Sequence, residues 1–210
     1  DGKLTLGFGN SSSTRKLSKK EQALLDEKER EERLQKLADA IDRGPQGIVD
    51  SIATVDDLIL LHDLMNAMLK VELTDPKFSI KGVRTQAIQA MFRMLSMKTE
   101  ESAILRLQAS EVFSRMSKDR DFAACIIEEK VHEHLIHDVR QPDVGKTVLF
   151  WLLNVFYYLM RPDGVRPDGG RIELLRRAGL PGACRELLER HAENVELQAH
   201  LYELQRLFEM

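Results

Sequence analysis

The stretch that decides the fold is Val148–Met160, Val-Leu-Phe-Trp-Leu-Leu-Asn-Val-Phe-Tyr-Tyr-Leu-Met, in which Asn154 is the one fully polar side chain. A helix needs roughly 20 apolar residues to cross a bilayer, so this shorter stretch predicts a helix buried in protein on several faces. We expect the other segments to pack around it. A buried amide needs hydrogen-bond partners, so Asn154 should lie either in a satisfied core position or along a groove where a ligand supplies them.

Length and composition indicate one substantial globular domain. The 210 residues are 43% hydrophobic and 31% charged, which is neither disorder-like nor membrane-like. The net charge of −3 lacks the basic excess of a general nucleic-acid binder, so no nucleic-acid partner and no membrane span are expected.

The N-terminus and the cysteines favour a reducing compartment. No apolar secretory run precedes the first helix, and Asp1 suggests an excised piece of a longer chain. Cys125 and Cys184 lie far apart in helix-like segments, which predicts buried free thiols. The expected location is the cytoplasm.

The N-terminal part divides into a tail and a charged helix. Residues 1–17 combine three glycines with a Ser/Thr run, which predicts a flexible tail or a docking segment. The sequence Ser18-Lys19-Lys20-Glu21 is a capping box and predicts a helix over 18–43. Its middle is wholly charged and predicts a solvated face, and any self-association is expected through 1–43. Near its end the helix carries an apolar stripe at helical spacing, which predicts that this end packs on the core. The stripe consists of Leu34, Leu37, Ala38 and Ile41.

The remaining segments keep the helical period, and none alternates like a strand over more than a few residues. The fold class is therefore all-α. The expected helices cover 46–53, 55–72, 85–97, 100–117, 119–129, 130–139, 144–160, 171–178, 181–190 and 194–209.

These segments follow a repeated order of short, medium and long helices. The clearest trio covers 171–178, 181–190 and 194–209, and another covers 119–130, 131–140 and 144–160. The medium helices begin near Gln86, Val131 and Leu180. The first spacing falls within the 40–47 residues of armadillo or HEAT units, and the second exceeds it by about one loop.

The chain resembles an armadillo repeat protein. The family's Ala-Gly/Leu-Pro seam between first and second helices is met by Ala178-Gly179-Leu180-Pro181. In that family the third helix carries a Trp and, four residues later, an Asn, both lining a concave groove. Superimposing this pattern gives four pairs: His62 and Asn66, Glu111 and Arg115, Phe150 and Asn154, and Tyr202 and Arg206.

The resemblance implies a right-handed α-α superhelix of about three to four repeats over 44–210. It implies a non-enzymatic scaffold that binds an extended peptide or a partner helix in the groove. Trp151 stands one residue beyond the family's Trp position, a rotation of about 100°, which predicts a core side chain.

A second hypothesis uses the Arg-rich C-terminal face to bind a folded partner such as a small GTPase or a chaperone. Every basic residue after Lys146 is an arginine, and Arg suits carboxylate or phosphate contacts. The sequence Arg-Pro-Asp-Gly occurs at 161–164 and again at 166–169, each predicting a tight turn.

Two motifs resemble known functional sequences, but each lacks a required residue. Gly145-Lys146-Thr147 looks like the end of a P-loop, but Arg140 stands where its first glycine belongs. The cluster His132–His137 misses the zinc-protease pattern because Ile136 occupies the second histidine position. A metal-dependent hydrolase built on this cluster is the enzyme-class alternative; otherwise we expect no catalytic residue and no cofactor.

Overall fold

The computed structural model describes residues 19–71, 78, 80–162 and 164–210. This part of the chain is helical and contains no strand, which confirms the all-α prediction. The helices are α1 Lys19–Asp42, α2 Gly44–Thr54, α3 Leu58–Lys70, α4 Lys81–Ser96, α5 Ala103–Met116, α6 Arg120–Glu128, α7 Val131–Val139, α8 Lys146–Met160, α9 Gly169–Arg177, α10 Leu180–Arg190 and α11 Val195–Glu209. No helix in the described ranges is long and apolar enough to cross a membrane.

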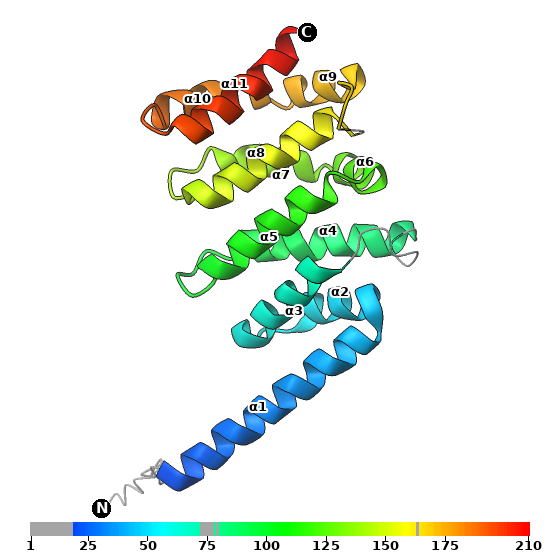
Figure 1. Cartoon of the computed structure of the whole chain (residues 1–210), viewed down its shortest axis with the longest axis vertical. Helices are drawn as coiled ribbons and strands as arrows, with labels where there is room; N and C mark the ends of the chain where they lie inside the picture. Colours follow the sequence, from blue (N-terminus) through cyan, green and yellow to red (C-terminus); the bar gives the residue numbers. More distant parts are fainter. Residues whose placement is uncertain (1–18, 72–77, 79, 163) are drawn as a thin grey trace, which may run out of the picture. The chain divides into compact units, whose positions relative to one another are not determined.

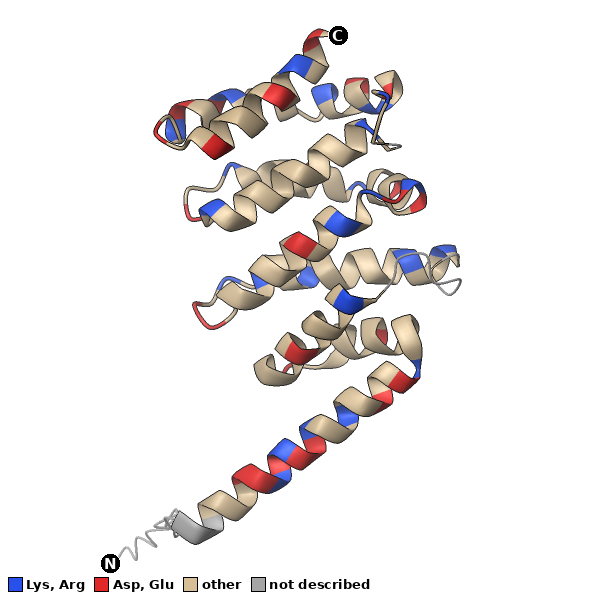
Figure 2. Ribbon diagram, viewed as in Figure 1, with Lys and Arg blue, Asp and Glu red and all other residues tan. Residues whose placement is uncertain are grey.

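The chain divides into two compact units, Asp1–Lys36 and Leu37–Met210. In the first, α1 alternates acidic and basic side chains (Figure 2). Lys28 and Glu32 form an ion pair at 3.9 Å, and the Gln22 amide donates a hydrogen bond to Asp26 at 2.9 Å. Such pairs four residues apart support an exposed helix. The predictions for 1–17 and for the Ser18 capping box lie outside the described residues.

The second unit packs its helices in two rows. In one row α3 contacts α5, α5 contacts α8, and α8 contacts α11; in the other α2 contacts α4, α4 contacts α6, and α7 contacts α10 (Figure 1). Helices also pair across the rows, as α2 with α3, α4 with α5 and α10 with α11. Each long helix therefore lies between its partner in the other row and its neighbours in its own.

Helix α8 lies at the centre of this packing, against α5, α6, α7, α9 and α11. Its buried side chains are Leu149, Leu152, Leu153, Val155, Phe156, Leu159 and Met160. Full burial of such side chains stabilises by roughly 1.5–3 kcal/mol each, so this face is a main source of stability. The opposite face of α8 is half-buried.

The starts of three helices share one backbone feature. Gly44 at the start of α2, Lys130 before α7 and Gly179 before α10 have φ of 72°, 56° and 92°. This left-handed conformation suits glycine, which has no Cβ, and Lys130 adopts it with a side chain in place. Gly179-Leu180-Pro181 opens α10 as the sequence predicts, with proline in the first turn.

Two local expectations were wrong in part. Of the predicted apolar stripe, Leu37 packs against the core, together with Ala40 one turn later. The other three members are exposed, Leu34 by 53%, Ile41 by 49%, and Ala38. The second Arg-Pro-Asp-Gly unit is not a separate turn, because Asp168 caps α9 by accepting from the Arg171 N–H at 3.1 Å and the helix begins at Gly169. In the first unit the Gly164 N–H donates to the Arg161 carbonyl at 2.8 Å, as a turn requires.

Candidate partner-binding surface

The seven residues expected to line a groove all lie in the row α3, α5, α8 and α11, and none is fully buried. Asn66, Glu111, Arg115, Phe150 and Asn154 are half-buried, Tyr202 is 60% exposed, and Arg206 is exposed. Because these helices contact one another in order, the residues lie along one row of the unit.

The half-buried face of α8 is aromatic around one amide. Phe150, Trp151, Asn154, Tyr157 and Tyr158 recur at intervals of three and four residues, which places them on the same side of the helix. Helix α8 carries no charge after its first residue, Lys146 (Figure 2). Large, partly exposed aromatic side chains of this kind are common in binding surfaces.

The Asn154 carboxamide is half-buried and has no hydrogen-bond partner among the described residues. It therefore keeps two donors and its acceptor oxygen available at the surface. Within the described ranges, no hydrogen bond or ion pair joins it to Glu111, Arg115, Tyr202 or Arg206.

Asn66, the corresponding amide on α3, is already hydrogen-bonded within the chain. Gln108 on α5 donates from Nε2 to Oδ1 of Asn66 at 2.8 Å, and Nδ2 of Asn66 lies 3.3 Å from Nδ1 of His62. Asn66 thus links two neighbouring helices of the row, and Gln108, which holds it, was missed by the sequence analysis. Nothing in the sequence marks a pair separated by 42 positions.

Two cations cover the tyrosines of α8. Lys118 Nζ lies 5.1 Å from the ring centroid of Tyr158, and the Arg161 guanidinium lies 5.1 Å from that of Tyr157 while donating to its hydroxyl at 2.9 Å. Cation–π contacts of this kind hold the rings in place. The sequence analysis did not predict these four residues as part of the surface. Lys118 follows Arg115 by three positions, and Tyr157 and Tyr158 follow Asn154 by three and four. Arg161 stands four positions after Tyr157.

Phe150 and Trp151 are both half-buried beside α11. Phe150 packs against the core, and its ring lies 4.8 Å from that of His200 on α11. Both residues line a cavity of about 250 Å³ beside Asn194 and Glu196 at the start of α11. The prediction of Trp151 as a core residue was wrong, because its side chain is half-buried and lines this cavity.

The Arg-rich C-terminal face is largely engaged within the chain. Arg176 and Arg177 pair with Glu173 at 2.5 and 2.9 Å, Arg171 lies 3.5 Å from Asp168, and Arg190 donates to the carbonyls of Arg140 and Gln141. With Arg161 on Tyr157, five of the eight arginines have an intramolecular partner. The face therefore offers fewer free guanidinium groups than its composition suggests.

The three histidines of α7 lie in different environments. His132 is buried at 2% exposure with Nδ1 unpaired, whereas His134 lies against the Phe92 ring and His137 contacts Gln141. Among the described residues, no three His, Cys, Asp or Glu side chains are placed to hold a metal ion.

Neither cysteine is placed for chemistry. Cys125 and Cys184 are both free and buried, as expected, and burial raises the pKa of the Cys184 thiol to about 12. A thiol is a poor nucleophile in that state.

No protein-family model matches the chain, and no curated protein matches it.

Proposed function

We propose that this chain is a non-enzymatic interaction module of armadillo-like repeats, which holds an extended peptide or a partner helix against the row α3, α5, α8 and α11. The observation that carries the proposal is the half-buried Asn154 carboxamide, which has no partner in the described chain and is surrounded by aromatic side chains. An asparagine can bond both the N–H and the C=O of a peptide backbone.

The repeat arrangement is supported by features that recur along the chain. A left-handed residue stands at the start of α2, α7 and α10, and each of these helices is followed by a longer one in the opposite row. Repeats that each contact only their neighbours build such an order. On this basis we propose three to four stacked units in a right-handed superhelix over 44–210.

The cations at the tyrosines of α8 favour an acidic partner. Lys118, in the turn after α5, and Arg161, at the end of α8, each lie 5.1 Å from a tyrosine ring centroid. The cations at the rings of Tyr157 and Tyr158 add planar apolar surface beside positive charge. A peptide with acidic residues flanking an aliphatic or aromatic anchor fits both features.

A folded partner bound at the Arg-rich C-terminal face has less support. Most arginines there already bond to Glu173, Asp168, Tyr157 or backbone carbonyls, so a partner would have to displace these contacts.

Peptide selection tests the proposal. Random peptides are selected on the full chain, and the enriched ones are measured by fluorescence polarisation against wild type, Asn154→Ala and Gln89→Ala. Gln89 is an exposed amide on α4 in the other row, so it controls for loss of a surface amide. We expect acidic peptides whose affinity falls about tenfold with Asn154→Ala, the worth of one or two hydrogen bonds, and stays unchanged with Gln89→Ala. Peptides that bind all three proteins equally would refute the proposed site.

A further inference from the structure

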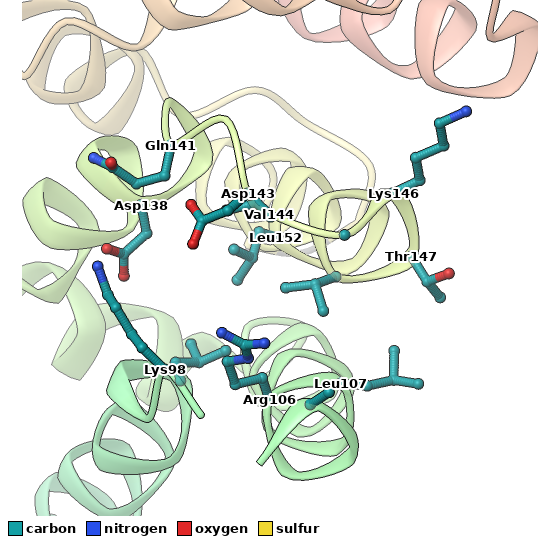
Figure 3. Close-up of a pocket in the computed structure, with 14 residues that line it drawn as sticks. Lys98, Arg106, Leu107, Asp138, Gln141, Asp143, Val144, Lys146, Thr147 and Leu152 are labelled. Carbon is teal, nitrogen blue, oxygen red and sulfur yellow. The ribbon is translucent and has the colours of Figure 1, made fainter. Parts of the chain in front are cut away.

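A cavity of about 300 Å³ lies between the end of α4, the start of α5, the end of α7 and the start of α8 (Figure 3). Its volume lies at the lower end of the roughly 300–1,000 Å³ found for small-molecule pockets. A ligand for it must therefore be small.

One part of the lining is aliphatic. Leu95 from α4, Leu107 from α5, and Val148 and Leu152 from α8 contribute side chains to the cavity. Leu95 and Leu152 belong to the buried core, so this wall is a rigid continuation of it. Such a surface suits a branched aliphatic group.

The other part of the lining is charged: cations on the α4–α5 side face carboxylates on the α7–α8 side, where Lys146 also lines the cavity with its side chain directed away from the carboxylates (Figure 3). Lys98 and Arg106 extend from the α4–α5 side toward Asp138 and Asp143 on the α7–α8 side (Figure 3). Among the described residues, none of these four makes a direct ion pair or a hydrogen bond with another. Asp138 is half-buried and feels the charge of Lys98, while burial, the dominant effect, raises its pKa.

Arginines bond across the neighbouring junctions of the same row. Arg93 on α4 donates to the carbonyls of Ile52 and Val55 at the end of α2, at 2.5 and 3.1 Å, and also lines a cavity of about 340 Å³ between α2 and α4. Arg190 at the end of α10 donates to the carbonyls of Arg140 and Gln141 after α7, at 2.8 and 3.2 Å. At the junction between α4 and α7, the carboxylate of Asp138 lines the cavity.

We propose that this cavity binds a free α-amino acid with an aliphatic side chain. Its carboxylate pairs with Arg106, its ammonium group with Asp138 and Asp143, and its side chain lies on Leu95, Leu107 and Leu152. A zwitterion satisfies both charged sides at once, which a simple cation or anion cannot do because it meets like charge on one side.

Calorimetric titration of the full chain with L-leucine and L-valine tests the assignment. The controls are 4-methylpentanoate, which lacks the ammonium group, and 3-methylbutylamine, which lacks the carboxylate. We expect saturable binding of at least one amino acid, at least about tenfold tighter than either single-charge analogue. No saturation by either amino acid up to about 10 mM, or equal binding of the analogues, overturns the proposal.

Substitutions on the two charged sides of the cavity test whether each side binds the amino acid. Arg106→Met and Asp138→Asn should each weaken amino-acid binding about tenfold, because each removes one charge-assisted contact. Arg185→Met, at an exposed position on α10, is the matched control and should bind as wild type does. Far-UV circular dichroism and melting curves confirm folding of each variant. Unchanged affinity in both folded cavity variants overturns the proposal.

Discussion

Gln108 and Asn66 join α5 to α3 through a hydrogen bond of 2.8 Å. Gln108 is 8% exposed, and its Oε1 has no partner among the described residues, so its amide depends on Asn66. Asn66→Ala should therefore lower the free energy of unfolding by about 1–3 kcal/mol, the cost of leaving a buried amide unsatisfied. Urea denaturation measures the change. A double variant that also carries Gln108→Leu should recover part of the loss, and equal stability of Asn66→Ala and wild type would show that the bond is not formed in solution.

Trp151→Ala should cost less stability than loss of a core aromatic. Trp151 is half-buried, so we expect a loss of about 1–2 kcal/mol. Phe156→Ala, at a fully buried position of the same helix, should cost roughly 3–5 kcal/mol. Chemical denaturation of both variants measures the two free energies of unfolding. Equal losses of stability would show that Trp151 is a core residue.

Lys130→Gly should stabilise the chain. Lys130 has a φ of 56°, a conformation that costs a residue with a Cβ about 1–2 kcal/mol. Glycine removes this strain, but part of the gain in stability is lost because glycine makes the unfolded chain more flexible. The net gain is about 0.5–1 kcal/mol. Lys130→Ala keeps the Cβ and should show no gain in the midpoint of urea unfolding. If alanine stabilises as much as glycine, the backbone is not the cause.

Stability should fall in mild acid because of His132. Burial lowers the pKa of this side chain from its usual 6.5, against smaller opposing effects of the Ile126 backbone and Glu133, while His134 and Lys130 lower it further. The unfolded chain then binds more protons than the folded one, so the free energy of unfolding decreases as pH falls below about 6.5 and levels off below the folded pKa.

His132→Leu removes this proton uptake. Between about pH 7.5 and about pH 5, urea unfolding should show a smaller loss of stability for the variant than for wild type. Identical pH profiles for the two proteins would mean that His132 does not titrate differently in the folded chain.

Much of the fold could be predicted because local signals decide it. The 3.6-residue period and breakers such as Gly179-Leu180-Pro181 mark each helix after Gly44 to within a few residues, and Val148–Met160 marks the helix at the centre of the packing. The observed helix start differs from the predicted one where a side chain caps the helix, as Asp57 caps α3 and Asp168 caps α9.

The candidate surface was predictable only in part. Spacing along one helix places Asn154 beside Phe150, but it cannot show that Phe150 and Trp151 both lie beside α11, because that depends on how α11 packs. The Asn66–Gln108 bond and the cavity at Asp138 each combine segments far apart in the chain. Such pairings follow from tertiary packing and leave no local signal.

The central claim is that Asn154 serves binding and not folding. The measurement that tests it most directly is Asn154→Ala, followed in parallel by urea unfolding and by affinity for a peptide selected on wild type. The account predicts a free energy of unfolding within about 0.5 kcal/mol of wild type, as for a surface position, together with about a tenfold loss of peptide affinity. A loss of stability of about 2 kcal/mol or more with peptide affinity intact would contradict it.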